Sequence, residues 1–149
     1  IMFENYDTYF GKLLASSVDV WLNNPLPPFE ASGTSGMKAI LNGVLQLSTL
    51  DGWFVEAADK NIGWTFGWQH QDNQVGDEHD LKMEEDSQAL YDCLATQVVK
   101  LYYDTLLGGQ IRPESEWIDK MIDAISQAGI FNTHRMIQEY SEKIWHYKK

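Results

Sequence analysis

The residues most able to do chemistry lie in one stretch, residues 29–43, with the letters FEASGTSGMKAILNG. Glu30 supplies a carboxylate, residues 32–36 are all small, and Lys38 places one amine at the start of a short apolar run. Small residues let backbone N–H groups approach a ligand closely, and a helix that begins there adds partial positive charge. The stretch therefore predicts an anion site, for a phosphate or for sugar hydroxyls, beside an amine.

The amine of Lys38 is the sharper clue. A lysine in a desolvated pocket becomes a nucleophile that can form an imine with an aldehyde. An aldehyde that also carries a phosphate, such as pyridoxal phosphate, would use both the amine and the anion site. On chemistry alone, exposure to solvent is favoured for both Lys38 and Glu30, because most charged side chains lie on the surface. A nucleotide is not the first hypothesis, because neither GxxxxGK[ST] nor GxGxxG spacing is present.

The elements around this stretch predict a βαβ unit. Residues 18–22 and 44–50 are apolar runs typical of buried strands, and residues 37–41 favour a short helix that an Asn-Gly pair ends. A strand, a helix and a strand in this order imply a parallel sheet with helices on its faces. Ligands of such sheets bind at the carboxyl ends of the strands, where residues 32–36 would lie.

Apolar residues at helical spacing occupy most of the remaining sequence. Residues 6–16 predict a helix, residues 61–68 an irregular strand, and residues 69–82 a polar loop. From about Glu84 onward the pattern is helical, with three apolar stripes that we expect to belong to the core. The stripes consist of Leu90, Leu94, Val98, Leu101 and Tyr102; of Trp117, Met121, Ile122 and Ile125; and of Met136, Ile137, Tyr140 and Ile144.

Composition narrows the function classes. A net charge of −11 over 149 residues argues against binding to nucleic acid or to an anionic membrane surface. The sequence contains no apolar stretch of about 18 residues, so it predicts no membrane span. It also lacks metal-ligand spacing such as HExxH, so it predicts no metal site. The single cysteine, Cys93, fits a reducing, cytoplasmic compartment and a buried position. The chain begins at Ile1 rather than at an initiator methionine, and we expect it to be a fragment.

Residues 30–43, EASGTSGMKAILNG, resemble the pyridoxal-phosphate attachment motif of the α-glucan phosphorylases, whose usual form is E-A-S-G-x-G-N-M-K-x-x-x-N-G. The letters TLDG at 49–52, ENY at 4–6 and the segment from Glu116 onward are also similar to that family, and most of all to a divergent prokaryotic branch. The motif residues that match in register are Glu30, Ala31, Ser32, Gly33, Met37, Lys38, Asn42 and Gly43.

The resemblance implies an activity and a set of site residues. The activity is reversible phosphorolysis, in which phosphate removes the terminal glucose of an α-1,4-glucan as glucose 1-phosphate. The implied cofactor is pyridoxal 5'-phosphate, with Lys38 as the catalytic residue that forms the imine. The other cofactor contacts would be Thr34, the backbone of Ser35, and Tyr6. The hydroxyls of the glucosyl unit would be bound by Glu30, Ser32 and the backbone of Ala31 and Gly33.

The resemblance also implies a domain organisation. The fold class is α/β, as part of the C-terminal Rossmann-like domain of a two-domain, GT-B type glycosyltransferase that ends in an α-helical segment. Residues 1–68 would form the βαβ portion with the cofactor and sugar loop, residues 69–83 a polar loop, and residues 84–149 helices packed on the same domain. The missing N-terminal domain would supply the rest of the active site, so the fragment alone would be inactive; a homo-oligomer is left open.

The sequence departs from the family motif at Ser35-Gly36, where the usual residues are Gly-Asn, and at Asp7, where many members have Arg. A backbone contact at Ser35 could survive, whereas side-chain contacts from the usual Asn could not.

Two other functions share some of these sequence features. Retaining starch or glycogen synthases often have E-x7-E spacing in this loop, and Lys38 stands in place of the second acid. A non-catalytic carbohydrate-binding module could use aromatic rings to stack on sugars, although core packing is favoured for them. Those rings belong to Trp53, Trp64, Phe66 and Trp68.

Overall fold

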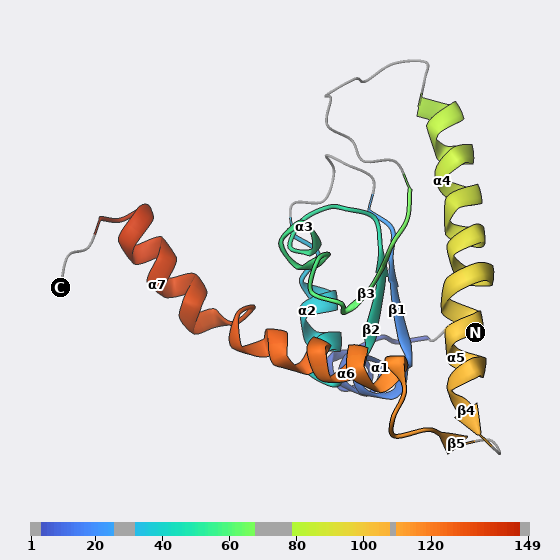
Figure 1. The fold of residues 1–149 in the computed structure, drawn as a ribbon. Coiled ribbons are helices and arrows are strands. Elements are labelled where there is room, and N and C mark those ends of the chain that lie inside the picture. Colours follow the sequence, from blue (N-terminus) through green and yellow to red (C-terminus); the bar gives the residue numbers. More distant parts are fainter. Residues whose placement is uncertain (1–3, 26–31, 68–78, 108–109, 147–149) are drawn as a thin grey trace.

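The computed structural model describes residues 4–25, 32–67, 79–107 and 110–146 (Figure 1). A three-stranded parallel sheet in the order β1-β2-β3 lies at the centre, and β4 and β5 form a separate antiparallel pair. The strands are β1 (Val20–Asn23), β2 (Leu45–Ser48), β3 (Gly63–Thr65), β4 (Leu106–Leu107) and β5 (Gln110–Ile111). The helices are α1 (Thr8–Ser17), α2 (Thr34–Ile40), α3 (Phe54–Ala57), α4 (His79–Cys93), the π-helical η1 (Leu94–Val98), α5 (Val99–Thr105), α6 (Glu116–Ser126), the 3₁₀ turn η2 (Gln127–Gly129) and α7 (Thr133–Lys143).

The predicted βαβ unit is confirmed. β1 and β2 pair in parallel with Val20 opposite Leu45, and α2 connects them. β2 also pairs in parallel with β3, and every residue of β2 is buried, as expected for the middle strand of a sheet covered on both faces. The close approach of β3 needs glycine at position 63, because a Cβ there would lie 1.8 Å from the Gln46 carbonyl oxygen.

Helices cover both faces of the sheet. Figure 1 shows α4 and α5 on one side, α2 and α3 on the other, and α6 across one end of the strands. The largest buried ring, Trp117 of α6, packs against Trp64 of β3 and Tyr102 of α5, with centroid distances of 5.8 and 5.1 Å. These three rings join the end of the sheet to the helices around it.

The starts of two helices, and the presence of some very short elements, differ from the sequence predictions. α2 begins at Thr34, directly after Gly33 in the left-handed conformation, so residues 34–36 form a helical turn rather than a loop. α4 begins at His79, which makes the end of the expected polar loop helical; residues 69–78 lie outside the described residues. α3 and the β4–β5 pair were not predicted, because elements of two to four residues are too short to show a period.

The first two apolar stripes have different outcomes. The stripe along α4, η1 and α5 is confirmed, since Val98 is buried and its other members pack against the core. In α6, Trp117 is 1% exposed and Met121 packs on the core, but Ile122 and Ile125 are 59% and 49% exposed, so the prediction is wrong for those two.

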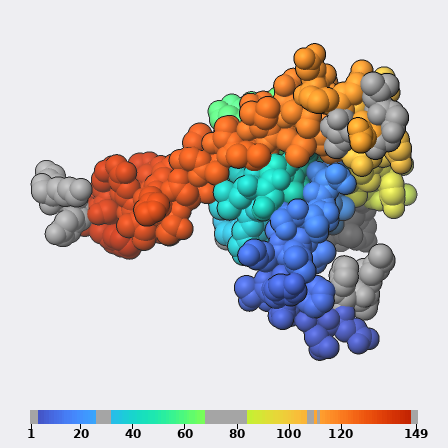
Figure 2. Space-filling view, turned by 90° about the horizontal axis from the view of Figure 1, so that it is seen from below, coloured from blue at the N-terminus to red at the C-terminus, as the bar shows by residue number. Residues whose placement is uncertain are grey.

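The third stripe, on α7, is exposed. Figure 2 shows α7, in red, projecting from the rest of the molecule. Its apolar residues Met136, Ile137 and Tyr140, with Ile144 just beyond its end, are between 44% and 59% exposed. Within α7, which the structure describes in full, no residue is buried. The prediction that this stripe belongs to the core is therefore wrong for this chain.

The cysteine and the three described aromatic rings are buried, as the sequence predicted. Cys93 is buried, and burial raises the pKa of its thiol. Trp53, Trp64 and Phe66 are each less than 10% exposed, so these rings pack in the core and cannot stack on a sugar; Trp68 lies outside the described residues. Within the described ranges, the helices are all too short or too polar to cross a membrane, and no cluster of His, Cys, Asp and Glu could hold a metal ion.

Candidate active site

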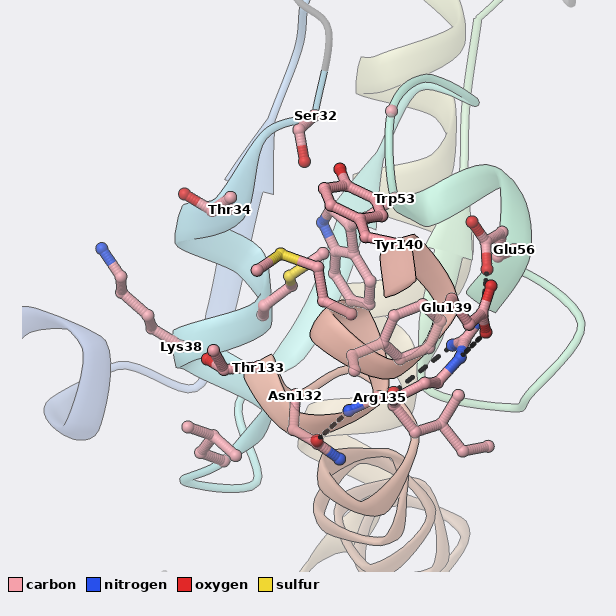
Figure 3. A pocket seen from close by; sticks show the side chains of 16 residues that line it. Ser32, Thr34, Lys38, Trp53, Glu56, Asn132, Thr133, Arg135, Glu139 and Tyr140 are labelled. Atoms are coloured by element: carbon pink, nitrogen blue, oxygen red, sulfur yellow. Dashed lines mark hydrogen bonds and ion pairs between the residues drawn. The ribbon is translucent and has the colours of Figure 1, made fainter. Parts of the chain in front are cut away.

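Lys38 and Thr34 lie on the same exposed side of α2. Residues four apart share one face of a helix, and both side chains border the same pocket. In Figure 3 the Thr34 hydroxyl and the Lys38 amine project from the side of α2 that faces away from Trp53 and Tyr140. The predicted amine is thus accessible to a ligand. The desolvated surroundings expected for it are not provided by the part of the chain that the structure describes.

The segment before α2 is held at the carboxyl edge of the sheet. The backbone N–H of Trp53, just after β2, donates to the Ser32 carbonyl oxygen at 3.0 Å. Gly52 has φ +54°, and a Cβ there would lie 2.3 Å from that same oxygen, so only glycine lets the two segments approach so closely. Ser32 therefore lies beside the carboxyl end of β2, where ligands of parallel sheets bind.

The first turn of α2 is also tied to β1. Trp21 donates its indole N–H to the Ser35 hydroxyl at 3.3 Å. The backbone N–H groups of a helix's first turn have no partner within the helix, so the Ser35 N–H stays able to serve a ligand. Ser35, which stands where the resembled motif usually has Gly, thus adds a link to β1.

A pocket of about 660 Å³ separates α2 from α7 (Figure 3). Ser32, Thr34 and Lys38 border it on the α2 side, and Tyr140 borders it on the α7 side. Trp53 lies between them, and its ring meets Phe131 edge to face at a centroid distance of 5.0 Å. Residues of α2 that include Thr34 and Lys38 therefore border one side of the pocket, and aromatic residues border the other side.

An ion network joins the α7 wall to α3. Arg135 donates to Glu139 at 2.6 Å and to Glu56 of α3 at 3.2 Å, and Lys143 donates to Glu139 at 2.7 Å. The hydrogen bonds from Lys143 and then Arg135 lower the pKa of the Glu139 carboxyl, while Glu139 and then Glu56 raise the pKa of Arg135. The Arg135 charge is thus already matched by carboxylates of this chain.

The structure brings some of the predicted site residues together. Ser32, Thr34 and Lys38 border one pocket, and Gly33 precedes α2 at its N-cap. Tyr6 is 67% exposed, packs over Gly11 of α1, and is not among the described residues that line the pocket. Glu30 and Ala31 lie outside the described residues.

Many residues that line this pocket were not predicted as site residues, among them Arg135 and Tyr140. Trp53 was predicted only as a core ring or, in the alternative binding module, as a ring that stacks on sugars. Trp53 gave one usable signal, because it directly follows the TLDG letters at the end of a predicted strand. Arg135 and Tyr140 gave none, since they lie about a hundred residues from the lysine stretch and reach it only through the fold.

Comparison with known proteins identifies the family. The family model for carbohydrate phosphorylases matches residues 1–110. The chain belongs to the carbohydrate phosphorylase family. Maltodextrin phosphorylase of Thermococcus litoralis is 43% identical over 146 residues, which cover 97% of this chain and 16% of that protein.

Two further relatives are also phosphorylases, and the chain matches a similarly small part of each. Glycogen phosphorylase of Aquifex aeolicus is 42% identical over 143 residues, covering 95% of the chain and 19% of that protein. Glycogen phosphorylase of Mycobacterium tuberculosis is 38% identical over 139 residues, covering 93% and 15%. The similarity thus extends past residue 110 into the C-terminal helices, and the chain spans less than a fifth of the length of these relatives.

Proposed function

We propose that this chain is the cofactor-binding part of an α-glucan phosphorylase, which transfers the terminal glucose of an α-1,4-glucan to phosphate and releases glucose 1-phosphate. The observation that carries the proposal is the placement of Lys38 and Thr34 on one accessible face of α2, beside the carboxyl edge of a parallel sheet. Membership of the carbohydrate phosphorylase family supports it, as do the names of the glycogen and maltodextrin phosphorylases among the relatives.

The donor set on α2 fits pyridoxal 5'-phosphate. Lys38 offers a primary amine for a covalent link to the aldehyde, and one turn earlier Thr34 offers a hydroxyl that can donate to the phosphate. The Ser35 backbone N–H would add a second donor, and Tyr6 would lie near the ring. When bound, the cofactor supplies a phosphate that exchanges a proton with the substrate phosphate, and the task of these residues is to position it.

The glucosyl unit would lie at the segment before α2. In Figure 3 the Ser32 hydroxyl points into the space between Thr34 and Trp53. Gly33, with φ +69°, turns the backbone there in a conformation that other residues rarely adopt. We assign the binding of the sugar hydroxyls to the side chains of Glu30 and Ser32 and to the backbone of Ala31 and Gly33.

The remainder of the active site would come from the rest of the polypeptide. In the proposed GT-B arrangement a second, N-terminal domain faces the Rossmann-like portion across a cleft. That domain would cover the exposed apolar face of α7 and enclose Lys38, which is accessible in this chain. A cytoplasmic location belongs to the same proposal, supported by the single, buried cysteine.

Chemical trapping tests the proposal. We would add pyridoxal phosphate to the complete polypeptide that contains this sequence, reduce any imine with borohydride, and locate the labelled peptide by mass spectrometry. We expect one dominant label, at Lys38, because its amine adjoins the anion-binding segment. Lys38→Arg keeps the charge but cannot form the imine, and Lys12→Arg on exposed α1 is the matched control.

The outcomes are distinct. Lys38→Arg should lose the label, cofactor retention and glucose 1-phosphate formation, while Lys12→Arg should keep all three. Equal labelling of many lysines, or full activity of Lys38→Arg, would contradict the assignment. The 149 residues alone should show no phosphorolysis, and activity in that fragment would disprove the claim that half of the site lies elsewhere.

A further inference from the structure

Gly36 occupies a position on α2 where no side chain fits. Gly36 is buried on the inner side of the helix, and the φ angle there is an ordinary one. A Cβ would lie 2.6 Å from Gln46 Oε1, 2.9 Å from Trp53 Cζ2 and 3.0 Å from Trp53 Nε1. The usual family motif has Asn here, so in this chain other atoms occupy the volume that a side chain at position 36 would need.

The Trp53 indole is the fixed part of that obstruction. The Gln46 amide is the end of a flexible side chain, held by one hydrogen bond to the Val44 carbonyl oxygen at 3.2 Å. Trp53 is 5% exposed, and its ring packs edge to face against Phe54 at 5.8 Å and Phe131 at 5.0 Å. The amide can rotate, whereas the indole can yield only if α3 or the segment before α7 moves too.

Trp53 contacts the lysine segment at two places. Its backbone N–H donates to the Ser32 carbonyl oxygen at 3.0 Å, and its ring lies against the helix that carries Lys38 at Gly36. It also borders the pocket together with Thr34 and Lys38. One rigid residue after β2 therefore sets both the start of α2 and the distance of α2 from the sheet.

We infer that Trp53 is a positioning residue for the cofactor lysine, and that Gly36 and Trp53 form a size-complementary pair that takes the place of the motif's usual Asn. The pair fixes how far α2 stands from the carboxyl edge of the sheet, and so where the Lys38 amine and the Thr34 hydroxyl meet a ligand. This inference rests on the proposed function, because it assumes that Lys38 binds the cofactor.

Reciprocal substitution in the complete polypeptide tests the pair. Gly36→Ala adds the Cβ that the indole excludes, and Trp53→Phe removes Nε1 and Cζ2 while keeping an aromatic ring. Gly129→Ala is the matched control, because a Cβ there would have nothing within 4 Å. Two quantities are measured for each variant: the thermal denaturation midpoint, and the fraction of Lys38 labelled by borohydride at a subsaturating concentration of pyridoxal phosphate.

We expect Gly36→Ala to lower the midpoint although alanine favours helices, because overpacking a close-packed site is unfavourable. Labelling at Lys38 should fall by about fivefold or more, as displacement of the helix by overpacking would produce. Trp53→Phe in the Gly36→Ala background should recover a large part of both quantities. Gly129→Ala should match the wild type.

Three results would count against the inference. A midpoint for Gly36→Ala equal to or above that of Gly129→Ala would show that position 36 has room. Additive losses in the double variant would show that residues 36 and 53 do not compete for space. Recovery of the midpoint without recovery of labelling would show that the pair is structural only. A wild-type protein without label at Lys38 would instead overturn the proposed function, while the midpoints still report on the packing.

Discussion

Lys120 offers the clearest test of how the sheet is joined to the C-terminal helices. Its side chain, on α6, is only 8% exposed, and its ammonium donates to Asn61 Oδ1 at 2.7 Å. The same ammonium lies 5.5 Å from the centroid of the Trp64 ring and 3.6 Å from Glu116 Oε1. The Asn61 side chain makes a second contact with α6, because its Nδ2 donates to Asp123 Oδ2 at 2.7 Å. Asn61 therefore gives the turn before β3 two side-chain hydrogen bonds to α6.

The substitution Lys120→Met keeps the length and apolar stem of the side chain and removes its charge. The lost charge-assisted hydrogen bond contributes about 1.5–3 kcal/mol, and the cation–π contact about 0.5–1 kcal/mol. The exposed Glu116 adds little, at most about 0.5 kcal/mol for an i,i+4 pair. Relief from burying an ammonium offsets part of this loss. We therefore expect a net loss of about 1–3 kcal/mol, or roughly 3–10 °C in the denaturation midpoint of a chain of this size.

Urea denaturation of the 149-residue chain measures this loss, with Lys60→Met as the control because Lys60 forms only an exposed pair with its neighbour Asp59. Asn61→Gly removes the amide while allowing the φ of +59° at that position. In a double-mutant cycle, Lys120→Met and Asn61→Gly should show a coupling of about 1 kcal/mol or more, because each variant alone breaks the same bond. A coupling near zero, or a loss for Lys120→Met no larger than that for Lys60→Met, would refute this account.

Two further predictions follow from the shifted pKa values. Because the pKa of Glu139 is lowered in the folded state, the stability it contributes is present above the unfolded pKa of about 4.3 and is lost as the pH falls through the folded value. Glu139→Gln should therefore unfold more easily than the wild type at pH 7 and equally easily near pH 2; a gap that persists unchanged at pH 2 would argue against an ionic origin. The buried Cys93 thiol has a raised pKa, so its reaction with a disulfide reagent at pH 8 should be much slower in the native protein than in urea. Equal rates in the two states would contradict the burial.

The sheet was predictable because its signals are local. Residues 18–22 and 44–50 are apolar runs on either side of a short helix, and the structure pairs their central parts in parallel as β1 and β2. The end of α2 was equally clear, since Gly43 takes φ +75° where the helix stops. The start of α2 was misplaced because small residues permit both a loop and a helical turn, and the contacts that select the turn come from Trp21 and Trp53 elsewhere in the fold.

The candidate site divides in the same way. Lys38 and Thr34 could be assigned from one continuous motif, and their shared face follows from helical geometry alone. The α7 side of the pocket could not be assigned from the sequence, because the contact between Arg135 and Glu56 joins residues 79 positions apart. Gly36 was recognised as a departure from the motif, but only the position of the Trp53 ring gives that departure a physical cause.

The exposed face of α7 shows what hydrophobic spacing can and cannot establish. The spacing of Met136, Ile137, Tyr140 and Ile144 correctly indicated a helix with one side that avoids water. The spacing does not show that this side is buried in the core, because burial requires a second surface. In this chain Arg135, near the start of α7, pairs with Glu56 of α3, and this contact leaves the apolar side of the helix exposed. An ion pair between exposed groups contributes little stability. A helix held in this way gains most of its stability only when another surface covers its apolar side. In the proposed enzyme that surface belongs to the part of the polypeptide that also encloses Lys38, so the same domain contact would order α7 and complete the site.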